Sequence, residues 1–411
     1  ARLEALGAKI TYEHKPENVE GASLIVRTAA VHDDNPEIVR AHELGIPVME
    51  RAEAWGHLMR DYDNVVCLAG THGKTTTSAM CAHIMHQGHL DCNAFLGGIA
   101  KNYGTNYILS KSDYVVIEAD EYDRSFHWLS PWISVVTATD PDHLDIYGTK
   151  EAYLESFSKY TSLIQPGGAL IMHTGLEMQP RLQQGVELYT YGRDAGDFHA
   201  ENISIEGGEI TFDFVSPTGR VAGVRLGQPV PINIDNGVAA MAMAQLAGCT
   251  ADELLYGMAT YGGVDRRFDF KIRTPRLVLL SDYAHHPKEI QQSVASLREL
   301  YADRHITAIF QPHLYSRTRD FYADFARSLS LLDNVVLCDI YPAREQPIPG
   351  VTSKLIYDNL AEGVGKEMIS KDEVPDYVRT HDFDVLVVLG AGDIDSYMPQ
   401  ITKILQERTK D

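Results

Sequence analysis

The hexapeptide Gly-Thr-His-Gly-Lys-Thr that begins at Gly70 combines residue types that could bind the phosphates of a nucleotide. Gly70 and Gly73 let the backbone approach an anion closely. Lys74 can reach the β- and γ-phosphates, and the Thr75 hydroxyl can serve as a ligand of Mg²⁺. The usual pattern G-x-x-x-x-G-K-[ST] is not met, because Leu68 stands where its first glycine would be. Taken alone, the segment is equally compatible with a tight turn that carries a surface lysine.

Side chains that could complete a metal and phosphate site follow two apolar runs. Acidic clusters are often only solvated loops, but open α/β sheets bind ligands at the carboxyl ends of their strands. Mg²⁺ prefers carboxylate, hydroxyl and phosphate oxygens, so Glu118 and Thr75 form a sensible pair of ligands. His143 could instead carry a proton or pair with Asp145. The candidates are Glu118, Asp120 and Glu121 in DYVVIEADEYD, and Asp142, His143 and Asp145 in WISVVTATDPDHLD.

A basic set of candidates lies in the last third of the chain, in the segments SDYAHHP, QPHLYSR and YPARE. Histidines are most often structural, so each one alone carries little weight. All three segments follow strand-like runs, however, and would gather on one rim of a parallel sheet. Arginines on such a rim suit carboxylate, phosphate or amino-acid groups. The candidates are His285, His286, His313, Arg317, Arg319 and Arg344.

These side chains need a scaffold that brings strand ends together, and the pattern of the chain predicts one. Apolar runs such as NVVCLAG, RLVLLSD and DVLVVLG alternate with helical, 3.6-periodic runs such as TTTSAMCAHIMHQ and KEIQQSVASLRELY. This alternation predicts an α/β fold with parallel sheets and crossover helices. GTHGKT then lies between a strand and a helix, where free N–H groups and the helix dipole favour an anion. The context therefore favours phosphate binding over a simple turn.

Three domains are predicted, because 411 residues exceed what one compact core usually holds. Residues 1–62 read as a partial α/β domain that opens on a helix, ARLEALGA, and a strand, AKITYEH. We expect its first strand and glycine-rich turn to be missing through truncation or disorder. Residues 63–270 form a central domain with a small antiparallel sheet over the glycine-rich stretch 197–231. Residues 271–411 form a second α/β unit.

Bulk composition excludes several classes of protein. The formal net charge is −21, which argues against a broad nucleic-acid surface. Five scattered cysteines without a CxxC pair indicate reduced thiols in a cytosolic protein. No run approaches the roughly 18 apolar residues of a membrane helix, and no signal peptide is visible. We therefore expect a cytoplasmic protein that binds neither nucleic acid nor membrane.

Taken in order, the motifs resemble those of the ATP-dependent Mur ligases, over about residues 35–392. The resemblance implies a UDP-sugar-binding Rossmann-like N-terminal domain, a central P-loop-type ATPase domain and a Rossmann-like C-terminal domain. It implies that the lactyl carboxylate of UDP-N-acetylmuramate becomes an acyl phosphate, which the amine of L-alanine then attacks, in peptidoglycan precursor synthesis. The motifs are GTHGKTTT, EADEYDRSF, DPDHLDIYG, GVDRRFDF, SDYAHHP, FQPHLYSRTRDF, PAREQPIPG and LGAGDI.

The resemblance also assigns roles, motif by motif. The ATP-binding positions are Gly70, Thr71, His72, Gly73, Lys74, Thr75, Thr76, Asn236, Arg267 and Asp282. The Mg²⁺ ligands are Thr75, Glu118 and His143. The catalytic residues are Lys74, His143, Arg267, His285 and His286, and the substrate-binding residues are His313, Arg317 and Arg344. The expected assembly is a monomer or a weak dimer.

Two departures from the family pattern and several alternatives accompany this interpretation. Ile232 stands where the family commonly has a histidine, four residues before Asn236, and the absent glycine-rich turn implies weak UDP-sugar binding. The nearest alternative is the recycling ligase that joins a whole peptide to UDP-N-acetylmuramate, although FQPHLYSRTR favours the alanine-adding enzymes. Folylpolyglutamate synthase is more remote. A non-catalytic nucleotide-binding protein and a metal phosphatase centred on DPDHLD are the remaining alternatives.

Overall fold

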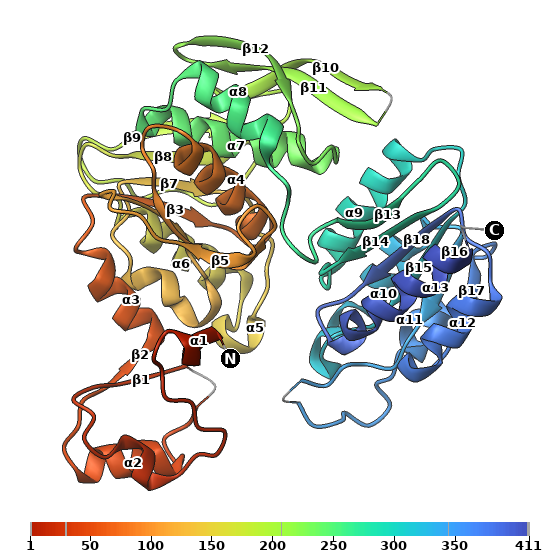
Figure 1. Cartoon of the computed structure of the whole chain (residues 1–411), viewed down its shortest axis with the longest axis horizontal. Helices are drawn as coiled ribbons and strands as arrows, with labels where there is room; N and C mark the ends of the chain where they lie inside the picture. The colour runs from red at the N-terminus through yellow and green to blue at the C-terminus, as the bar shows by residue number, and fades with distance from the viewer. Residues whose placement is uncertain (1, 29–30, 207, 344, 409–411) are drawn as a thin grey trace. The chain divides into compact units, whose positions relative to one another are not determined.

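The computed structural model describes residues 2–28, 31–206, 208–343 and 345–408. The chain divides into two compact units: a first part made of residues 1–74 and 111–189, and a second part made of residues 75–110 and 190–411. Figure 1 shows helices and strands alternating along most of the chain. The described strand pairings of the first part are parallel, whereas those of the second part are both parallel and antiparallel. The predicted α/β class is confirmed.

The first part is built on a parallel sheet. Strand β3 (Asn64–Ala69) lies between β6 (Tyr114–Glu118) and β7 (Ile133–Val136), and β7 pairs in turn with β8 (Ala169–His173). Almost every residue of these strands is buried, as expected for parallel strands covered on both faces. The carboxyl ends of β3, β6 and β7 therefore lie at one edge of the sheet. β9 (Glu187–Tyr191) follows β8 in the chain.

Short helices complete the first part. After β7 come α5 (Leu144–Tyr147) and α6 (Lys150–Thr161), and α6 begins where the Thr149 side chain accepts a hydrogen bond from the Ala152 N–H. Near the N-terminus a short parallel pair is accompanied by three helices. These elements are α1 (Arg2–Ala5), β1 (Ile25–Arg27), α2 (Pro36–Glu43), β2 (Val48–Glu50) and α3 (Arg51–Met59).

The prediction of a strand over AKITYEH is wrong, because residues 8–14 adopt no regular structure. Most of its side chains are exposed, and Tyr12 is 89% exposed. A strand needs a hydrogen-bonded neighbour and a face to bury, and within the described residues this segment has neither.

The second part begins with α4 (Lys74–Gln87), which continues the phosphate-loop segment, and the antiparallel pair β4 (Asn93–Ala100) and β5 (Thr105–Ile108). The predicted antiparallel sheet at 197–231 is confirmed as β10 (His199–Glu206), β11 (Glu209–Ser216) and β12 (Gly219–Arg225). Two helices follow, α7 (Ile232–Ala247) and α8 (Ala251–Thr260). A capping box between Thr250 and Glu253 starts α8.

The C-terminal sheet has the strand order β13-β14-β18-β15-β16-β17, parallel except for β13. Alternate residues of β18 point into two cores. Val385, Val387 and Leu389 pack with α9, α10 and α11, whereas Leu386 and Val388 pack with α12 and α13. The elements are β13 (Asp269–Arg273), β14 (Val278–Asp282), α9 (Pro287–Leu300), β15 (Ile306–Phe310), α10 (Tyr315–Leu329), β16 (Asn334–Leu337), α11 (Lys354–Asn359), β17 (Gly365–Met368), α12 (Val374–Thr380), β18 (Val385–Leu389) and α13 (Met398–Arg408).

Three further observations bear on the sequence predictions. β13 begins at Asp269, before the predicted domain boundary at residue 271, and the three domain boundaries stay predictions. All five cysteines are buried free thiols. Every helix in the described ranges is too short or too polar to cross a membrane.

Candidate functional site

The loop between β3 and α4 requires glycine at its first position. Gly70 has φ +137°, and a Cβ atom there would lie 2.1 Å from Thr137 Oγ1 and 2.9 Å from the Ala138 nitrogen. Both the backbone angle and the neighbouring segment therefore exclude a side chain. Gly73 also has a positive φ, +81°. The loop backbone thus lies close to the segment after β7, and its close approach to a phosphate stays a prediction.

Lys74 is held by two acceptors at the start of α4. Its Nζ donates to Glu121 Oε2 and to the Gly70 carbonyl oxygen, each at 2.6 Å. The Lys74 and Glu121 side chains are only 13% and 2% exposed. Burial lowers the pKa of Lys74, but the carboxylates of Glu121, Asp120 and Glu118 outweigh this effect and hold the pKa above its usual value. Lys74 is therefore a buried ammonium, fixed in the loop.

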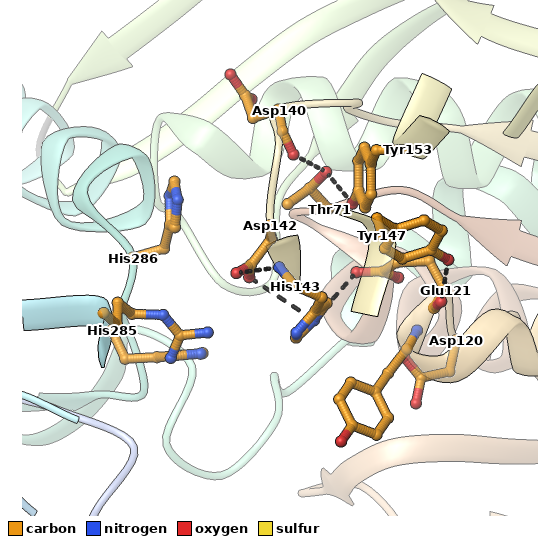
Figure 2. Close-up of polar contacts among 12 residues, drawn as sticks. Thr71, Asp120, Glu121, Asp140, Asp142, His143, Tyr147, Tyr153, His285 and His286 are labelled. Atoms are coloured by element: carbon orange, nitrogen blue, oxygen red, sulfur yellow. Dashed lines mark hydrogen bonds and ion pairs between the residues drawn. The ribbon is translucent and has the colours of Figure 1, made fainter. Parts of the chain in front are cut away.

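The segment after β7 runs alongside the phosphate loop and is bonded to it. The Thr71 N–H donates to the Ala138 carbonyl at 2.9 Å, and Thr71 Oγ1 donates to the Asp140 carbonyl at 2.8 Å. The Thr137 hydroxyl donates to the His72 carbonyl. Figure 2 shows Thr71 between Asp140 and Tyr153. The loop and the segment leading to His143 thus form one hydrogen-bonded unit.

His143 follows this segment and is held in a left-handed backbone conformation, with φ +53°, at the start of α5. Its Nε2 lies 3.7 Å from Asp142 Oδ2 and 3.9 Å from Glu121 Oε1. Its ring meets that of Tyr122 edge to face, 5.0 Å between centroids. Glu121 therefore faces both Lys74 and His143. Figure 2 shows the contacts of His143 with Asp142 and Glu121. The Asp145 side chain, the other predicted partner of His143, lies outside the described residues.

Two of the predicted Mg²⁺ ligands lie at the end of a strand and at the start of a helix. Glu118 is the last residue of β6, and Thr75 is buried in the first turn of α4. In the described part of the chain, no three His, Cys, Asp or Glu side chains converge to hold a metal by themselves. Mg²⁺ bound with a nucleotide usually takes only one or two protein carboxylates, so these oxygen donors fit the ion. Their pairing on one ion stays a prediction.

In the second part, β14 ends at Asp282, which the sequence predicts to contact the nucleotide. Asp282 is buried and accepts a hydrogen bond from the Ser293 hydroxyl of α9. Burial raises the pKa of its carboxyl above the usual value, although Ser293 and the Arg267 charge oppose this. The His286 side chain then accepts from the Lys288 N–H at 3.4 Å and begins α9.

Glu289 organises the side chains around that helix start. Its Oε2 accepts from the His285 and His286 N–H groups at 3.0 and 3.2 Å. Its Oε1 lies 3.8 Å from Arg267 Nη1. The Arg267 guanidinium also stacks on the Tyr283 ring, 4.7 Å from its centroid. These contacts place Arg267 and His285 next to one carboxylate.

The two arginines of the RRF motif have different surroundings. Arg266 Nη2 donates to the Gly390 and Gly392 carbonyls at 3.0 and 3.2 Å, so it holds the loop after β18. Among the described hydrogen bonds, the Arg267 guanidinium donates to no backbone carbonyl; it lies next to Glu289 and stacks on Tyr283. This difference supports Arg267, rather than its neighbour, as the arginine of a binding site.

The predicted C-terminal rim is partly assembled. The His285 and His313 rings meet edge to face, 5.8 Å between centroids, and His313 stacks on Tyr341 at 5.7 Å. Arg317 Nη1 lies 3.4 Å from His313 Nδ1. Arg319, by contrast, pairs with its neighbour Asp320 at the exposed face of α10. Arg344 lies outside the described residues.

Asn236 lies on α7 beside the first turns of α4. Its Oδ1 accepts from the Thr77 hydroxyl at 3.2 Å, and its Nδ2 donates to Asn233 Oδ1 at 3.2 Å. The Thr76 carbonyl accepts from the Tyr261 hydroxyl at 3.4 Å. Ile232 is the first residue of α7 and packs against the C-terminal core. Asn236 thus reaches the helix that carries the phosphate loop, whereas Ile232 serves packing.

Comparisons with known proteins cover most of the chain. Residues 1–63 match the Mur ligase family catalytic domain, residues 68–244 the Mur ligase middle domain, and residues 266–392 the Mur ligase glutamate ligase domain. The UDP-N-acetylmuramate–L-alanine ligase of Phocaeicola vulgatus is 62% identical over 98% of this chain and 89% of its own length. This chain belongs to the Mur ligase family.

Solved structures of Mur ligases share the fold. The UDP-N-acetylmuramate–alanine ligase of Thermotoga maritima is 28% identical, with a TM-score of 0.80 over 99% of this chain and 90% of its own. A murein peptide ligase from Psychrobacter arcticus is 21% identical, with a TM-score of 0.68 over 98% of this chain and 90% of its own, and shows the fold alone. The predicted family and three-domain α/β architecture are confirmed.

Several residues of this Mur ligase site were not predicted. Glu289 was detectable, because His286 and Glu289 have the spacing of a helix-capping box. Glu121 was noticed only as a carboxylate, since nothing in the sequence pairs it with Lys74. Tyr147 and Tyr153 gave no signal, because aromatic residues in a helical run are most often core.

Proposed function

We propose that this Mur ligase joins L-alanine to the lactyl carboxylate of UDP-N-acetylmuramate and converts ATP to ADP and phosphate. The observation that carries the proposal is the 62% identity to a UDP-N-acetylmuramate–L-alanine ligase over 98% of the chain. The buried Lys74 of the GTHGKT loop adds support, because its positive charge could neutralise a transferred phosphoryl group. A cytoplasmic location and a monomeric or weakly dimeric state stay predictions.

The chemistry follows from the substrates. A carboxylate resists attack by an amine at neutral pH, because oxide is a poor leaving group. Transfer of the γ-phosphoryl group to a carboxylate oxygen releases ADP and forms an acyl phosphate. The amine nitrogen of L-alanine then attacks the carbonyl carbon, and the tetrahedral intermediate collapses with release of phosphate. The protein mainly positions these groups and neutralises charge.

The phosphate loop and the segments after β6 and β7 would supply the phosphate site. The loop from Gly70 to Thr76 would surround the phosphates with N–H groups, and Lys74 would neutralise the transferred group. Glu118, Thr75 and His143 would hold Mg²⁺, which when bound neutralises phosphate charge. Lys74 supports this assignment, because its ammonium is buried at the start of α4 and lies 2.6 Å from Glu121 Oε2.

Residues later in the chain would make the remaining proposed contacts. Arg267 would bind ATP phosphates, Asn236 would contact the adenine side of the nucleotide, and Asp282 would be a further nucleotide contact. His285, His286, His313 and Arg317 would bind the amino acid or the acyl phosphate. The contacts that His285 and Arg267 share with Glu289 support their membership in one site.

Product analysis tests the proposal. The chain is incubated with ATP, Mg²⁺ and UDP-N-acetylmuramate, together with either L-alanine or a peptidoglycan tripeptide. We expect phosphate release that needs the UDP-sugar, and UDP-N-acetylmuramoyl-alanine by mass spectrometry. Release with the tripeptide alone would assign the chain to peptide recycling. Nucleotide binding without turnover of either acceptor would indicate a non-catalytic protein.

A further inference from the structure

A directed pair of hydrogen bonds links helix α6 to the phosphate loop. Tyr153 is fully buried, and its Oη lies 2.8 Å from Thr71 Oγ1. Thr71 Oγ1 also lies 2.8 Å from the Asp140 carbonyl oxygen, which can only accept. The single hydroxyl proton of Thr71 is therefore used on Asp140, and Tyr153 must donate to Thr71. The order of donation is Tyr153 to Thr71 to Asp140.

A second tyrosine holds the acidic turn after β6. Tyr147 Oη donates to the Glu121 carbonyl at 2.5 Å. Its ring meets the Tyr153 ring edge to face, with centroids 4.9 Å apart and an angle of 84°. The Arg124 guanidinium covers the Tyr147 ring at 4.8 Å. The two tyrosines thus contact each other, and each is bonded to a different loop of the site (Figure 2).

These contacts join three segments that the sheet alone would leave independent. Thr71 belongs to the loop that carries Lys74, Glu121 to the turn after β6, and Asp140 to the segment that leads to His143. The Lys74–Glu121 ion pair links the first two segments at 2.6 Å. The tyrosine pair is thus part of what fixes the phosphate loop relative to His143.

We propose that Tyr153, supported by Tyr147, is a positioning residue for phosphoryl transfer: its hydroxyl sets the phosphate loop against the segment that carries His143. This inference rests on the proposed ligase function. A displacement of about 1 Å between reacting groups costs on the order of 100-fold in rate, so a side chain that touches no substrate can still limit the reaction.

Helix α6 provides a matched control. Tyr160 lies seven residues after Tyr153, is also fully buried, and its hydroxyl is 2.8 Å from the Ser134 hydroxyl of β7. Tyr153→Phe and Tyr160→Phe each remove one buried hydroxyl that bonds to another hydroxyl. Only Tyr153 touches the phosphate loop. A purely structural role predicts the same result for both variants.

The expected result separates the two tyrosines. We expect similar losses of thermal stability, but Tyr153→Phe should lower kcat about ten-fold, whereas Tyr160→Phe should leave kcat within about two-fold of wild type. The KM for ATP should change less than kcat in Tyr153→Phe, because Lys74 and the loop N–H groups remain. Equal kcat values for the two variants would overturn the inference.

Substitutions of Thr71 give a second, independent measurement if a tyrosine variant folds poorly. Thr71→Val keeps the shape but removes the hydroxyl and should lower kcat about ten-fold or more, whereas Thr71→Ser restores the hydroxyl and should recover part of that loss. Equal kcat values for Thr71→Ser and Thr71→Val would contradict the directed chain of bonds. A wild-type chain that binds ADP but joins no amino acid would instead refute the proposed function.

Discussion

Two strand–loop–helix junctions of this Mur ligase share a topology but differ in chemistry. One connects β3 to α4, and the other connects β14 to α9. Each starts at the carboxyl end of a buried parallel strand, and each helix has 14 residues. The first places a buried lysine at the helix start, whereas the second places a buried aspartate at the strand end. Topology therefore makes both junctions candidate ligand sites, and the loop residues decide what each can bind.

The N–H groups at the two helix starts show why the chemistry differs. At β14–α9, Glu289 accepts from the His285 and His286 N–H groups, and His286 accepts from the Lys288 N–H. These donors are already used, and carboxylates at the turn would repel an anion. At β3–α4, the residue directly before the helix is Gly73, which has no side chain that could cap it. The helix start of the first junction is therefore better suited to a phosphate group than the helix start of the second.

The largest expected effect comes from Lys74→Met at the first junction. Ligation should fall at least about 1,000-fold, because the charge that meets the transferred phosphoryl group is lost. The free energy of unfolding should fall by about 3 kcal/mol, because Glu121 is left buried without its partner. Steady-state kinetics and urea unfolding measure the two effects.

Two control variants separate these effects. Lys74→Met with Glu121→Gln should recover most of the stability but none of the activity. Lys150→Met breaks the exposed pair with Glu177 and should cost less than about 1 kcal/mol. Full activity in the Lys74→Met variant would show that the lysine is not needed for phosphate chemistry at the first junction.

A smaller effect is expected from Gly70→Ala. The new Cβ would lie 2.1 Å from Thr137 Oγ1 and force the loop from its position. We expect kcat/KM for ATP to fall on the order of 100-fold, through displacement of the loop. The control is Gly148→Ala, where φ is also positive, +78°, but no neighbouring atom lies within 4 Å. It should lose only about 1 kcal/mol of stability. Equal kinetics for the two variants would show that the close approach at Gly70 is irrelevant.

The smallest expected effect comes from Asp282→Asn at the second junction. We expect kcat/KM for ATP to fall about ten-fold, through loss of one charged hydrogen-bond acceptor. Because burial raises the folded-state pKa of Asp282, the stability that its protonated form contributes is lost as pH rises through that pKa. Asparagine does not titrate, so the stability of the variant relative to wild type should increase as the pH rises above about 4, the ordinary pKa of an aspartate. Urea unfolding across this range measures it, and a difference that does not change with pH would contradict a raised pKa.

Much of the fold could be predicted because its strands are short apolar runs with distinct ends. β3, β6, β14 and β18 all lie within the predicted runs, and the antiparallel sheet follows from alternation between glycine turns. The strand predicted at AKITYEH is wrong for a different reason. Strand propensity without a paired neighbour does not make a strand, and the sequence does not reveal which segments find partners.

The candidate site was predictable to the extent that its chemistry lies in local motifs. Lys74, Glu118 and His143 stand at strand ends, so their types and positions were visible, although their roles stay predictions. The role of Tyr153 could not be predicted from the sequence. Tyr153 differs from Tyr160 in the partner of its hydroxyl, which is Thr71 of the phosphate loop for Tyr153 and Ser134 of β7 for Tyr160. Such contacts join residues 82 positions apart, and no spacing rule encodes them.

The most direct test of the account follows an isotope. UDP-N-acetylmuramate labelled with ¹⁸O in its lactyl carboxylate is turned over with ATP and L-alanine. If the phosphate loop activates that carboxylate as an acyl phosphate, one ¹⁸O atom per turnover must appear in the released phosphate, as mass spectrometry would show. Unlabelled phosphate alongside the ligated product would contradict the account, because activation would then not proceed through phosphoryl transfer to the carboxylate.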